Sequence, residues 1–363
     1  MARSGEAGLA DATLKVQCEL FVQDSEGGAR DANLFATLAL MLLPNVSEAT
    51  ARHVAGQLAP HPRTPPEVLA ALEARGGGVA QLVIERATVL PAALQADAAA
   101  HADPRLAASL AARADITDDL QSALLDRSEP TTLQALAGNR AIRLSRHAAS
   151  NLIAAAASDA GLARLLLERA DLDSIALLPL YLIATPAQKA GMREVLDLRL
   201  QERGMMTNLP ALSQAAQEEL LELSLNGLGA LLGGVCPLVR QSEGFITAAT
   251  EDSSRELTCL ALMAAGITAS DAIRMLLRTG DAVALDSARL GQLVELMRST
   301  SRQAATILLA TLVPKVAQVA EASERTTHVP AMVPGGTPSR AAQAVPARRP
   351  PHSRNLETLR SSG

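Results

Sequence analysis

The sequence predicts an all-α protein in which helix pairs stack one after another as an α-solenoid. The main observation is a recurring seven-residue frame: a helix end, a short polar break, and an apolar residue that opens a new helix. Its five copies begin at Leu58, Val83, Leu110, Leu136 and Leu166, with spacings of 25, 27, 26 and 30 residues. A period in this range, filled with helix-forming residues, is typical of a helical solenoid.

The composition supports the same fold class. Aromatic residues make up 1% of the 363 residues and tryptophan is absent, so the core must consist of Leu, Ala, Val, Ile and Met. Ala and Leu lead the ranking of helix propensities, and small Ala side chains let helices approach closely. No stretch shows sustained period-two alternation, so we expect no β-strand.

The chain divides into four parts. Residues 1–31 contain glycines and charges and are only weakly periodic, which predicts a flexible leader or one loose helix. Residues 32–204 form the predicted repeat domain, residues 205–320 a smaller helical domain without a clear period, and residues 321–363 a tail. The tail is rich in proline and arginine and almost free of large apolar residues, so we expect it to be disordered.

The first helix of the repeat domain is expected over residues 31–43, with Asp31 or Asn33 as its N-cap. Pro44 ends it, because the residue before a proline avoids the helical region. Its apolar run, Leu34 to Leu43, is about half the roughly 20 residues that a membrane span needs. We therefore interpret this run as a buried helix.

Further helix starts follow from local signals. In the segment 64–67, Thr64 is expected to cap, with a proline at the first helical position. Thr117 and Asp173 mark equivalent starts, Pro179 should kink or shorten its helix, and Gly204 should close the helix of residues 187–203. In the second domain we expect helices over residues 210–225, 244–265, 270–278 and 287–312.

The repeat frame, Leu-Ala-x-Arg-x-Asp-Ile-Thr in the copy at Leu110, resembles the alphaproteobacterial helical-repeat family known as domain of unknown function 2336. Residues 58–69 are similar to that family's entry repeat, and residues 184–192 to the segment that closes its repeats. The resemblance covers residues 35–203 well and residues 209–312 loosely. It implies a HEAT-like solenoid of about five repeats, and it implies no activity or ligand.

The net charge, the aromatic content and the cysteines limit the functions and the compartment to expect for this protein. The net charge of −5 and the scarcity of aromatic side chains argue against a general nucleic-acid binder. The three cysteines lie far apart, which suits a reducing compartment and buried thiols. Residues 1–15 contain no apolar segment typical of a secretory signal, so we expect a soluble, cytoplasmic protein.

No catalytic, cofactor-binding or metal-binding pattern emerges, and no cofactor is expected. The segment 226–235 is glycine-rich, but a helix rather than a strand precedes it, so we interpret it as a break or as small-residue packing. No histidine pair has the spacing of a helical metal site, and Cys236 and Cys259 have no histidine beside them. A site in the second domain stays open if Asp252, Arg255, Glu256 and Cys259 converge in a cleft.

The candidate partner-binding residues are basic. The fourth position of the frame is occupied by His61, Arg86, Arg113, Asn139 and Arg169. A cation there satisfies carbonyls at a helix end, and stacking could also align these side chains as a ladder that binds an acidic partner. The densest basic run adds a second group to this candidate surface: Arg140, Arg143, Arg146 and His147.

The function predicted from these features is non-enzymatic: a scaffold or regulator that binds a partner protein along the groove of the solenoid. Two alternatives stay open. One is a HEAT-like protein that binds nucleic acid through a continuous basic groove. The other is an enzyme with its site in the second helical domain.

Overall fold

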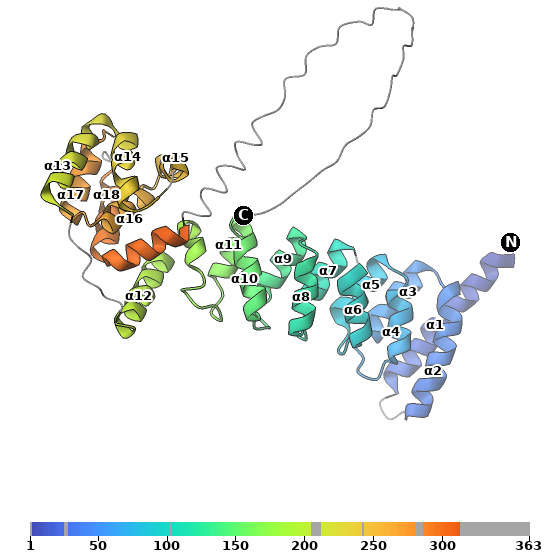
Figure 1. The fold of residues 1–363 in the computed structure, drawn as a ribbon. Helices are drawn as coiled ribbons and strands as arrows, with labels where there is room; N and C mark the ends of the chain where they lie inside the picture. The colour runs from blue at the N-terminus through green and yellow to red at the C-terminus, as the bar shows by residue number, and fades with distance from the viewer. Residues whose placement is uncertain are drawn as a thin grey trace, which may run out of the picture.

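The computed structural model describes residues 2–24, 28–101, 103–204, 212–241, 243–280 and 286–312. All regular secondary structure in these ranges is helical, and they contain no strand. The all-α prediction is therefore confirmed (Figure 1). The predicted disordered tail, residues 321–363, lies outside the described residues. None of the described helices combines the length and the apolar character that crossing a bilayer requires.

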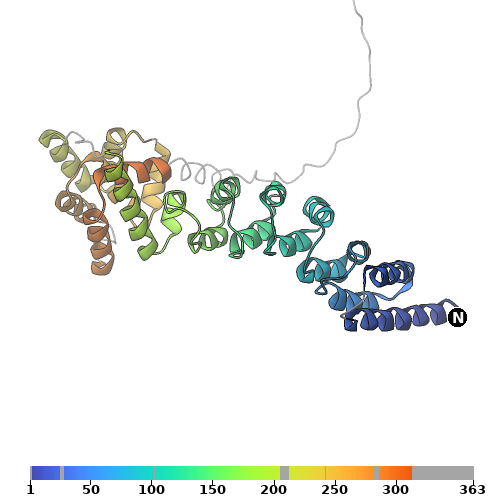
Figure 2. The same cartoon turned by 90° about the horizontal axis from the view of Figure 1, so that it is seen from below.

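The helices form an elongated succession that ends in a more compact group (Figures 1 and 2). The succession consists of α1 (Ala2–Gln23), α2 (Ala29–Leu42), α3 (Glu48–Leu58), α4 (Pro66–Glu73), α5 (Gly77–Arg86), α6 (Ala92–His101), α7 (Pro104–Ala111), α8 (Asp118–Asp126), α9 (Pro130–Gly138), α10 (Arg146–Ala155) and α11 (Ala160–Leu167). The 3-10 helix η2 (Leu178–Ile183) and α12 (Pro186–Glu202) follow, and the group comprises α13 (Gln214–Leu223), α14 (Leu228–Leu238), α15 (Glu243–Glu251), α16 (Glu256–Ala265), α17 (Ala269–Arg278), α18 (Ser287–Arg298) and the helical residues 302–312.

Two rows of helices make up the elongated part. In the first row each odd-numbered helix contacts the next, from α1 through α3, α5, α7 and α9 to α11. In the second row α2 contacts α4, α6 contacts α8, and α8 contacts α10. Helices that are neighbours in the chain pack across the rows, as α1 does on α2 and α3 on α4. A helix inside the first row thus buries one face against the other row and its sides against its own row.

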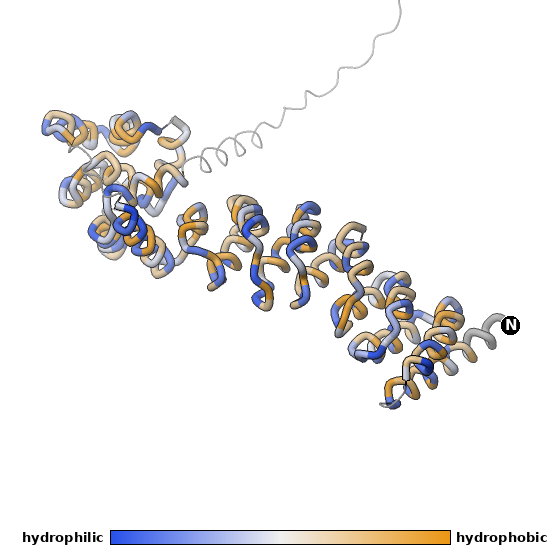
Figure 3. The backbone as a smooth tube through the Cα atoms, turned by 60° about the horizontal axis from the view of Figure 1, so that its bottom comes forward, coloured by the Kyte–Doolittle hydropathy of each residue, from blue (hydrophilic) through white to orange (hydrophobic). Residues whose placement is uncertain are grey.

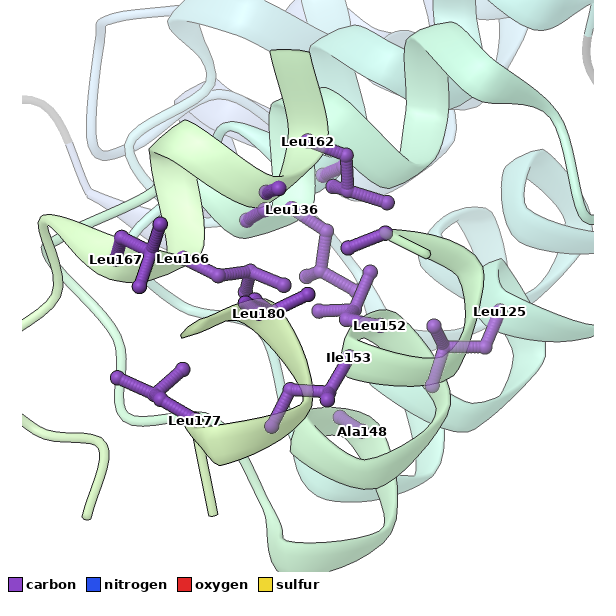
Figure 4. Packing of buried hydrophobic residues seen from close by; sticks show 14 of the residues in the cluster. Leu125, Leu136, Ala148, Leu152, Ile153, Leu162, Leu166, Leu167, Leu177 and Leu180 are labelled. Carbon is purple, nitrogen blue, oxygen red and sulfur yellow. The ribbon is translucent and has the colours of Figure 1, made fainter. Parts of the chain in front are cut away.

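The core between the rows is aliphatic, as the composition predicted. Figure 4 shows ten of its labelled side chains, from Leu125 to Leu180, converging from successive helices. The first position of every frame is fully buried: Leu58, Val83, Leu110, Leu136 and Leu166 each have 0% of their surface exposed. Three of the four aromatic residues lie at the ends of this core, and the fourth, Phe245, is buried in α15 of the C-terminal group. Phe21 stacks on Phe35 with ring centroids 4.2 Å apart, and Tyr181 is buried beside α12.

Of the two expectations for the N-terminal segment, a flexible leader or one loose helix, the structure has the helix, which packs into the core. The segment forms α1, whose Ala10, Leu14, Cys18 and Phe21 are buried. These residues recur at helical spacing and pack against the second helix and the third, so the weak periodicity concealed a regular apolar stripe. The start of α2 is corrected. It begins at Ala29 with Gly28 as its N-cap, and the carboxylate of Asp31 accepts a hydrogen bond from the Gly28 amide at 3.0 Å.

Most other helix boundaries follow the predicted signals. The hydroxyl of Thr117 caps α8 and the C′ glycine Gly204 follows α12 with φ 62°. At the start of α4, Pro65 rather than Thr64 is the cap, because the Thr64 hydroxyl donates to the Leu58 carbonyl at 2.6 Å. Pro179 falls in η2, so the helix expected from Asp173 is reduced to a 3-10 turn.

The glycine-rich segment after α13 is helical and not a break. It forms α14, which buries Leu231, Leu232 and Val235. A Cβ atom on Gly234 would lie 2.5 Å from Leu223 Cδ1, so the glycine permits the close approach of α13. The expected helix over residues 244–265 is divided in two at Arg255, whose φ of 61° interrupts the helical backbone.

Candidate functional site

The connections from first-row to second-row helices carry the frame. They follow α3, α5, α7 and α9, and the frame at Leu166 spans the end of α11. The rows bring these connections to one edge of the elongated part, because each first-row helix is stacked on the next. The fourth frame positions therefore lie along this edge, each next to the corresponding position of the neighbouring first-row helix.

Arg169 is the most deeply buried of these residues, with 1% of its side chain exposed. Its Nη1 donates to the carbonyl oxygens of Ala137 at 3.0 Å and Asn139 at 2.6 Å. Its Nη2 donates to the carbonyl of Ile142 at 2.7 Å. These carbonyls belong to the end of α9 and the loop that follows it, so one guanidinium joins two successive first-row helices.

Arg113 occupies the equivalent position after α7, two helices before α11 in the first row. Its Nη1 donates to the carbonyl of Ile84 near the end of α5 at 2.6 Å, and 9% of its side chain is exposed. Between the two arginines, the buried amide of Asn139 donates to the carbonyls of Ala111 at 2.9 Å and Arg113 at 2.6 Å. The fourth frame position thus connects α5 to α7, α7 to α9, and α9 to α11. We call each arginine that donates to the end of the preceding helix in its row an arginine bridge.

An acidic residue two positions later fixes the guanidinium. Arg169 forms two hydrogen bonds with Asp171, both 2.9 Å, and Arg113 forms two with Asp115, both 2.7 Å. Hydrogen bonding from Arg113 holds the pKa of Asp115 below its usual range. Burial alone would raise the pKa of Asp171, but hydrogen bonds from Arg169 and the Leu144 amide outweigh it and lower the pKa.

The second row contains arginine bridges that the frame did not predict. Arg127, after α8, donates to the carbonyl of Ala99 in α6 at 3.0 Å and pairs with Glu129 at 2.7 Å. Arg75, after α4, donates to the carbonyls of Leu43 at 2.6 Å and Val46 at 3.0 Å. A signal for one of them is present in the sequence, because Arg127 has an acid two residues later, as Arg113 and Arg169 do.

These contacts correct the proposed ladder. Arg113 and Arg169 are not available to a partner, since their donors are directed to carbonyls within the protein. His61 is partly buried and its ring centroid lies 5.2 Å from that of Phe21, so its side chain packs at the N-terminal end of the core. Arg86 is exposed. The recurring position is thus mainly structural, and the cation near a helix C-terminus satisfies free carbonyls.

The second predicted group is exposed. Arg140, Arg143, Arg146 and His147 lie in the loop after α9 and the first turn of α10, and all four have exposed side chains. Arg140 forms an ion pair with Glu168 at 2.5 Å, and His147 Nε2 lies 3.0 Å from the amide of Asn151. Within the described residues, the guanidinium groups of Arg143 and Arg146 have no hydrogen-bond or ion-pair partner. We call these four residues the basic cluster.

The basic cluster includes a cation, Arg146, in the first turn of a helix. Ser145 caps α10, Arg146 and His147 follow it, and the first turn contains no acid. The positive end of the helix dipole disfavours cations at this position. By contrast, α8 has Asp118 and Asp119 in its first turn, where the dipole favours them. The local folding energetics therefore do not account for the basic residues of α10.

A separate polar network lies where α12 meets the C-terminal group. Lys189 pairs with Glu256 at 2.7 Å, and Arg193 donates to the Tyr181 hydroxyl at 2.8 Å. Burial raises the pKa of Tyr181 to about 12 despite the neighbouring Arg193. Asp197 accepts hydrogen bonds from the hydroxyl and amide of Ser301. A hollow of about 380 Å³ beside this network is lined by residues of α12 together with Glu295 and Ser299.

The four residues that would indicate an enzyme site each lie within the packing of the described helices. Asp252 accepts from the Leu257 amide at 3.0 Å, Arg255 donates to carbonyls at the end of α15, and Glu256 pairs with α12. Cys259 is completely buried, and burial together with the charges of Glu256 and Asp252 raises the pKa of its thiol. Asp252, Arg255 and Glu256 thus make contacts that hold the ends of α15 and α16 in place.

Neither metal-binding groups nor known relatives indicate a different chemistry. Among the described residues, no three His, Cys, Asp or Glu side chains are grouped in a way that could hold a metal ion. No family model, curated protein or solved structure matches this chain. The resemblance to domain of unknown function 2336 accordingly stays a prediction.

Proposed function

We propose that the two rows of helices form a HEAT-like α-solenoid of about five helix pairs, and that this protein is a non-enzymatic scaffold for a partner protein. The succession of contacts supports the architecture, because each helix of the first row packs on the next and, in the second row, α2 packs on α4, α6 on α8 and α8 on α10. The arginine bridges support it as well, since they connect equivalent helix ends one repeat apart. On this proposal the domain of unknown function 2336 is the family to which the chain would belong.

The observation that carries the function is the basic cluster on the edge between α9 and α10. Two of its guanidinium groups have no partner among the described residues, and Arg146 in the first turn of α10 opposes the helix dipole. An acidic surface on a partner would pair with these guanidinium groups and would offset the unfavourable interaction of Arg146 with the helix dipole. We therefore assign the partner an acidic patch that docks on Arg143, Arg146 and the adjoining exposed side chains, with Arg140 at the margin beside Glu168.

The bridges explain how such a surface can be presented. They are buried or half-buried, and they hold the loop that carries the cluster: Arg169 donates to Ile142 and Asn139, and the Gln121 amide donates to the Arg143 carbonyl at 3.1 Å. A loop anchored at several backbone positions loses little conformational entropy when its exposed side chains bind. The buried arginines thus position the exposed ones.

The test compares two charge-reversed variants of the full chain. One is Arg143→Glu/Arg146→Glu; the control is Arg105→Glu/Arg164→Glu, which changes the charge equally at exposed residues of α7 and α11. Each tagged protein would be purified from the native cell and its bound proteins quantified by mass spectrometry. We expect one acidic protein to be lost from the first variant and kept by the control.

Binding of that purified protein would then be measured as a function of salt. Docking through the basic cluster predicts a salt dependence that weakens in the Arg143→Glu/Arg146→Glu variant. Equal recovery by both variants would overturn the assignment. Salt-dependent binding of the wild-type chain to double-stranded DNA or RNA, abolished by the same variant, would instead favour the nucleic-acid alternative.

A further inference from the structure

The N-terminal end of the two rows exposes a set of large apolar side chains. On α1 these are Leu9, Val16 and Leu20, and on α2 they are Leu34, Leu38 and Met41. Their exposed fractions range from 41% for Leu38 to 70% for Leu9. We call these six residues the N-terminal apolar face. Figure 3 shows hydrophobic positions on both helices at this end of the molecule.

The spacing of these residues places each set on one side of its helix. Leu34, Leu38 and Met41 recur at four and three residues, and Leu9, Val16 and Leu20 at seven and four, so each set forms a stripe. The buried stripes are different: Leu14, Cys18 and Phe21 on α1, and Phe35, Ala36 and Ala39 on α2. Both helices are therefore apolar on two sides, although α2 was expected to be wholly buried.

On α2, charged side chains are missing where a solvent-exposed helix normally has them. Between Asp31 and Glu48 the sequence contains no charged residue, so α2 is uncharged from Ala32 to its end. On α1 the uncharged Thr13 and Gln17 lie beside the stripe, and the exposed carboxylates of Glu19 and Asp24 lie at its margin. A surface of this kind is typical of an interface and not of a helix that faces water.

The position of the face indicates what could cover it. The described helices α1 and α2 are the first members of the two rows, and they contact α3 and α4 on their inner side. Within each row the next helix is the neighbour that buries a helix side, and terminal repeats need a polar outer face to stay soluble. Another helix pair of the same character would continue the packing of both rows.

We propose that this end of the molecule binds the same end of a second copy of the chain, as a two-fold symmetric dimer. A two-fold interface needs a single self-complementary patch, and the uncharged α2 half of this face buries no like charges when it meets its own copy. The six side chains expose on the order of 500 Å² of apolar surface, against about 800 Å² per partner in a standard interface. Their polar neighbours Thr13, Thr37 and Gln17 would supply the rim.

The test uses charge at the centre of the face. Leu34→Glu/Leu38→Glu would place four carboxylates in the two-fold interface, while Val89→Glu/Leu225→Glu adds the same charge at residues 69% and 59% exposed elsewhere. The mass in solution would be measured by light scattering and analytical ultracentrifugation. We expect a dimer for the wild type and the control, with a dissociation constant weakened at least about 100-fold in the first variant.

A mixing experiment separates loss of docking from loss of folding. Leu34→Lys/Leu38→Lys should also be monomeric alone, and mixing it with the Glu variant should restore a heterodimer, because opposite charges then face each other. A wild-type chain that stays monomeric at about 100 µM would overturn the proposal, whether or not it sediments with lipid vesicles or binds another protein. A Glu variant that remains dimeric would overturn it as well. The basic cluster is unchanged in all these variants, so their outcome is independent of partner binding there.

Discussion

Arg169 and Asn139 are 30 residues apart in the chain, yet the Nη1 of Arg169 lies 2.6 Å from the carbonyl oxygen of Asn139. The side chain of Asn139 in turn donates to the carbonyl of Arg113 at 2.6 Å, and Arg113 donates to Ile84. One hydrogen-bonded chain therefore runs along the first row from α11 back to α5. It satisfies carbonyls that the helix ends would otherwise leave without partners.

This relationship predicts a large stability loss when Arg169 is replaced. Arg169→Met should lower the free energy of unfolding by about 3 kcal/mol, because three carbonyls lose their donor and a partly buried Asp171 loses its counterion. Arg169→Lys should still cost about 2 kcal/mol, since an ammonium cannot reproduce the planar fork. Urea denaturation measures both.

Arg164→Gln is the matched control for Arg169, because it removes an exposed guanidinium from α11. Its effect should stay within about 0.5 kcal/mol of the wild type. A Lys variant as stable as the wild type would show that charge alone, and not the forked geometry, joins the two helices.

Leu110 provides a test of the aliphatic core. Its side chain is fully buried at the first position of its frame, so Leu110→Ala should cost about 2–5 kcal/mol. Val89, in the last position of the preceding frame, is 69% exposed, and Val89→Ala should change the stability by less than about 0.5 kcal/mol. Equal losses of stability in the two variants, measured by denaturant unfolding, would mean that the buried first position of the frame contributes no more to stability than the exposed last position.

The frame predicted the first-row helix ends because the requirements at these ends are local. A buried Leu or Val, a polar break and an N-cap such as Thr117 are each visible within a few residues. The role of Arg169 was not visible in the same way. Whether its guanidinium meets solvent or the Asn139 carbonyl depends on how closely α11 stacks on α9, which no local pattern specifies.

The other departures have the same physical origin. The exposure of Leu34 and Met41 could not be predicted, because an uncharged apolar run reads the same whether one or two of its sides are covered. The sequence did not predict α14, because its glycines lower the helix propensity. In the fold, however, Gly234 packs against Leu223, where a side chain at position 234 would not fit. Tertiary contacts decide both cases.

The carboxylates beside the arginine bridges predict how stability depends on acidity. The pKa values of Asp115 and Asp171 are lowered in the folded protein. A lowered pKa stabilises the fold above the unfolded value of about 3.9, and this contribution is lost as the pH falls through the folded value. Stability should therefore decrease steeply below about pH 4.

Asp171→Asn removes one of these titrating groups. The variant should be less stable than the wild type near neutral pH, and the difference should shrink as the pH is lowered, since Asp171 is then protonated in both states of the wild type. Urea titrations between about pH 7 and 2.5 would show the two curves converging. Parallel curves over the whole range would contradict a stabilising role for the ionised carboxylate.

The basic cluster makes a prediction in which stability and binding change in opposite directions. Arg146 lies in the first turn of α10, where its charge opposes the helix dipole, and its guanidinium has no ion-pair partner among the described residues. Arg146→Glu should therefore raise the free energy of unfolding by a few tenths of a kcal/mol, while binding of the acidic partner weakens. Replacing a residue that serves only folding would lower the stability of the protein. Thermal melts and binding assays on the same preparation therefore distinguish the two roles. If Arg146→Glu lowers the stability, or leaves partner binding unchanged, this arginine is not a docking residue.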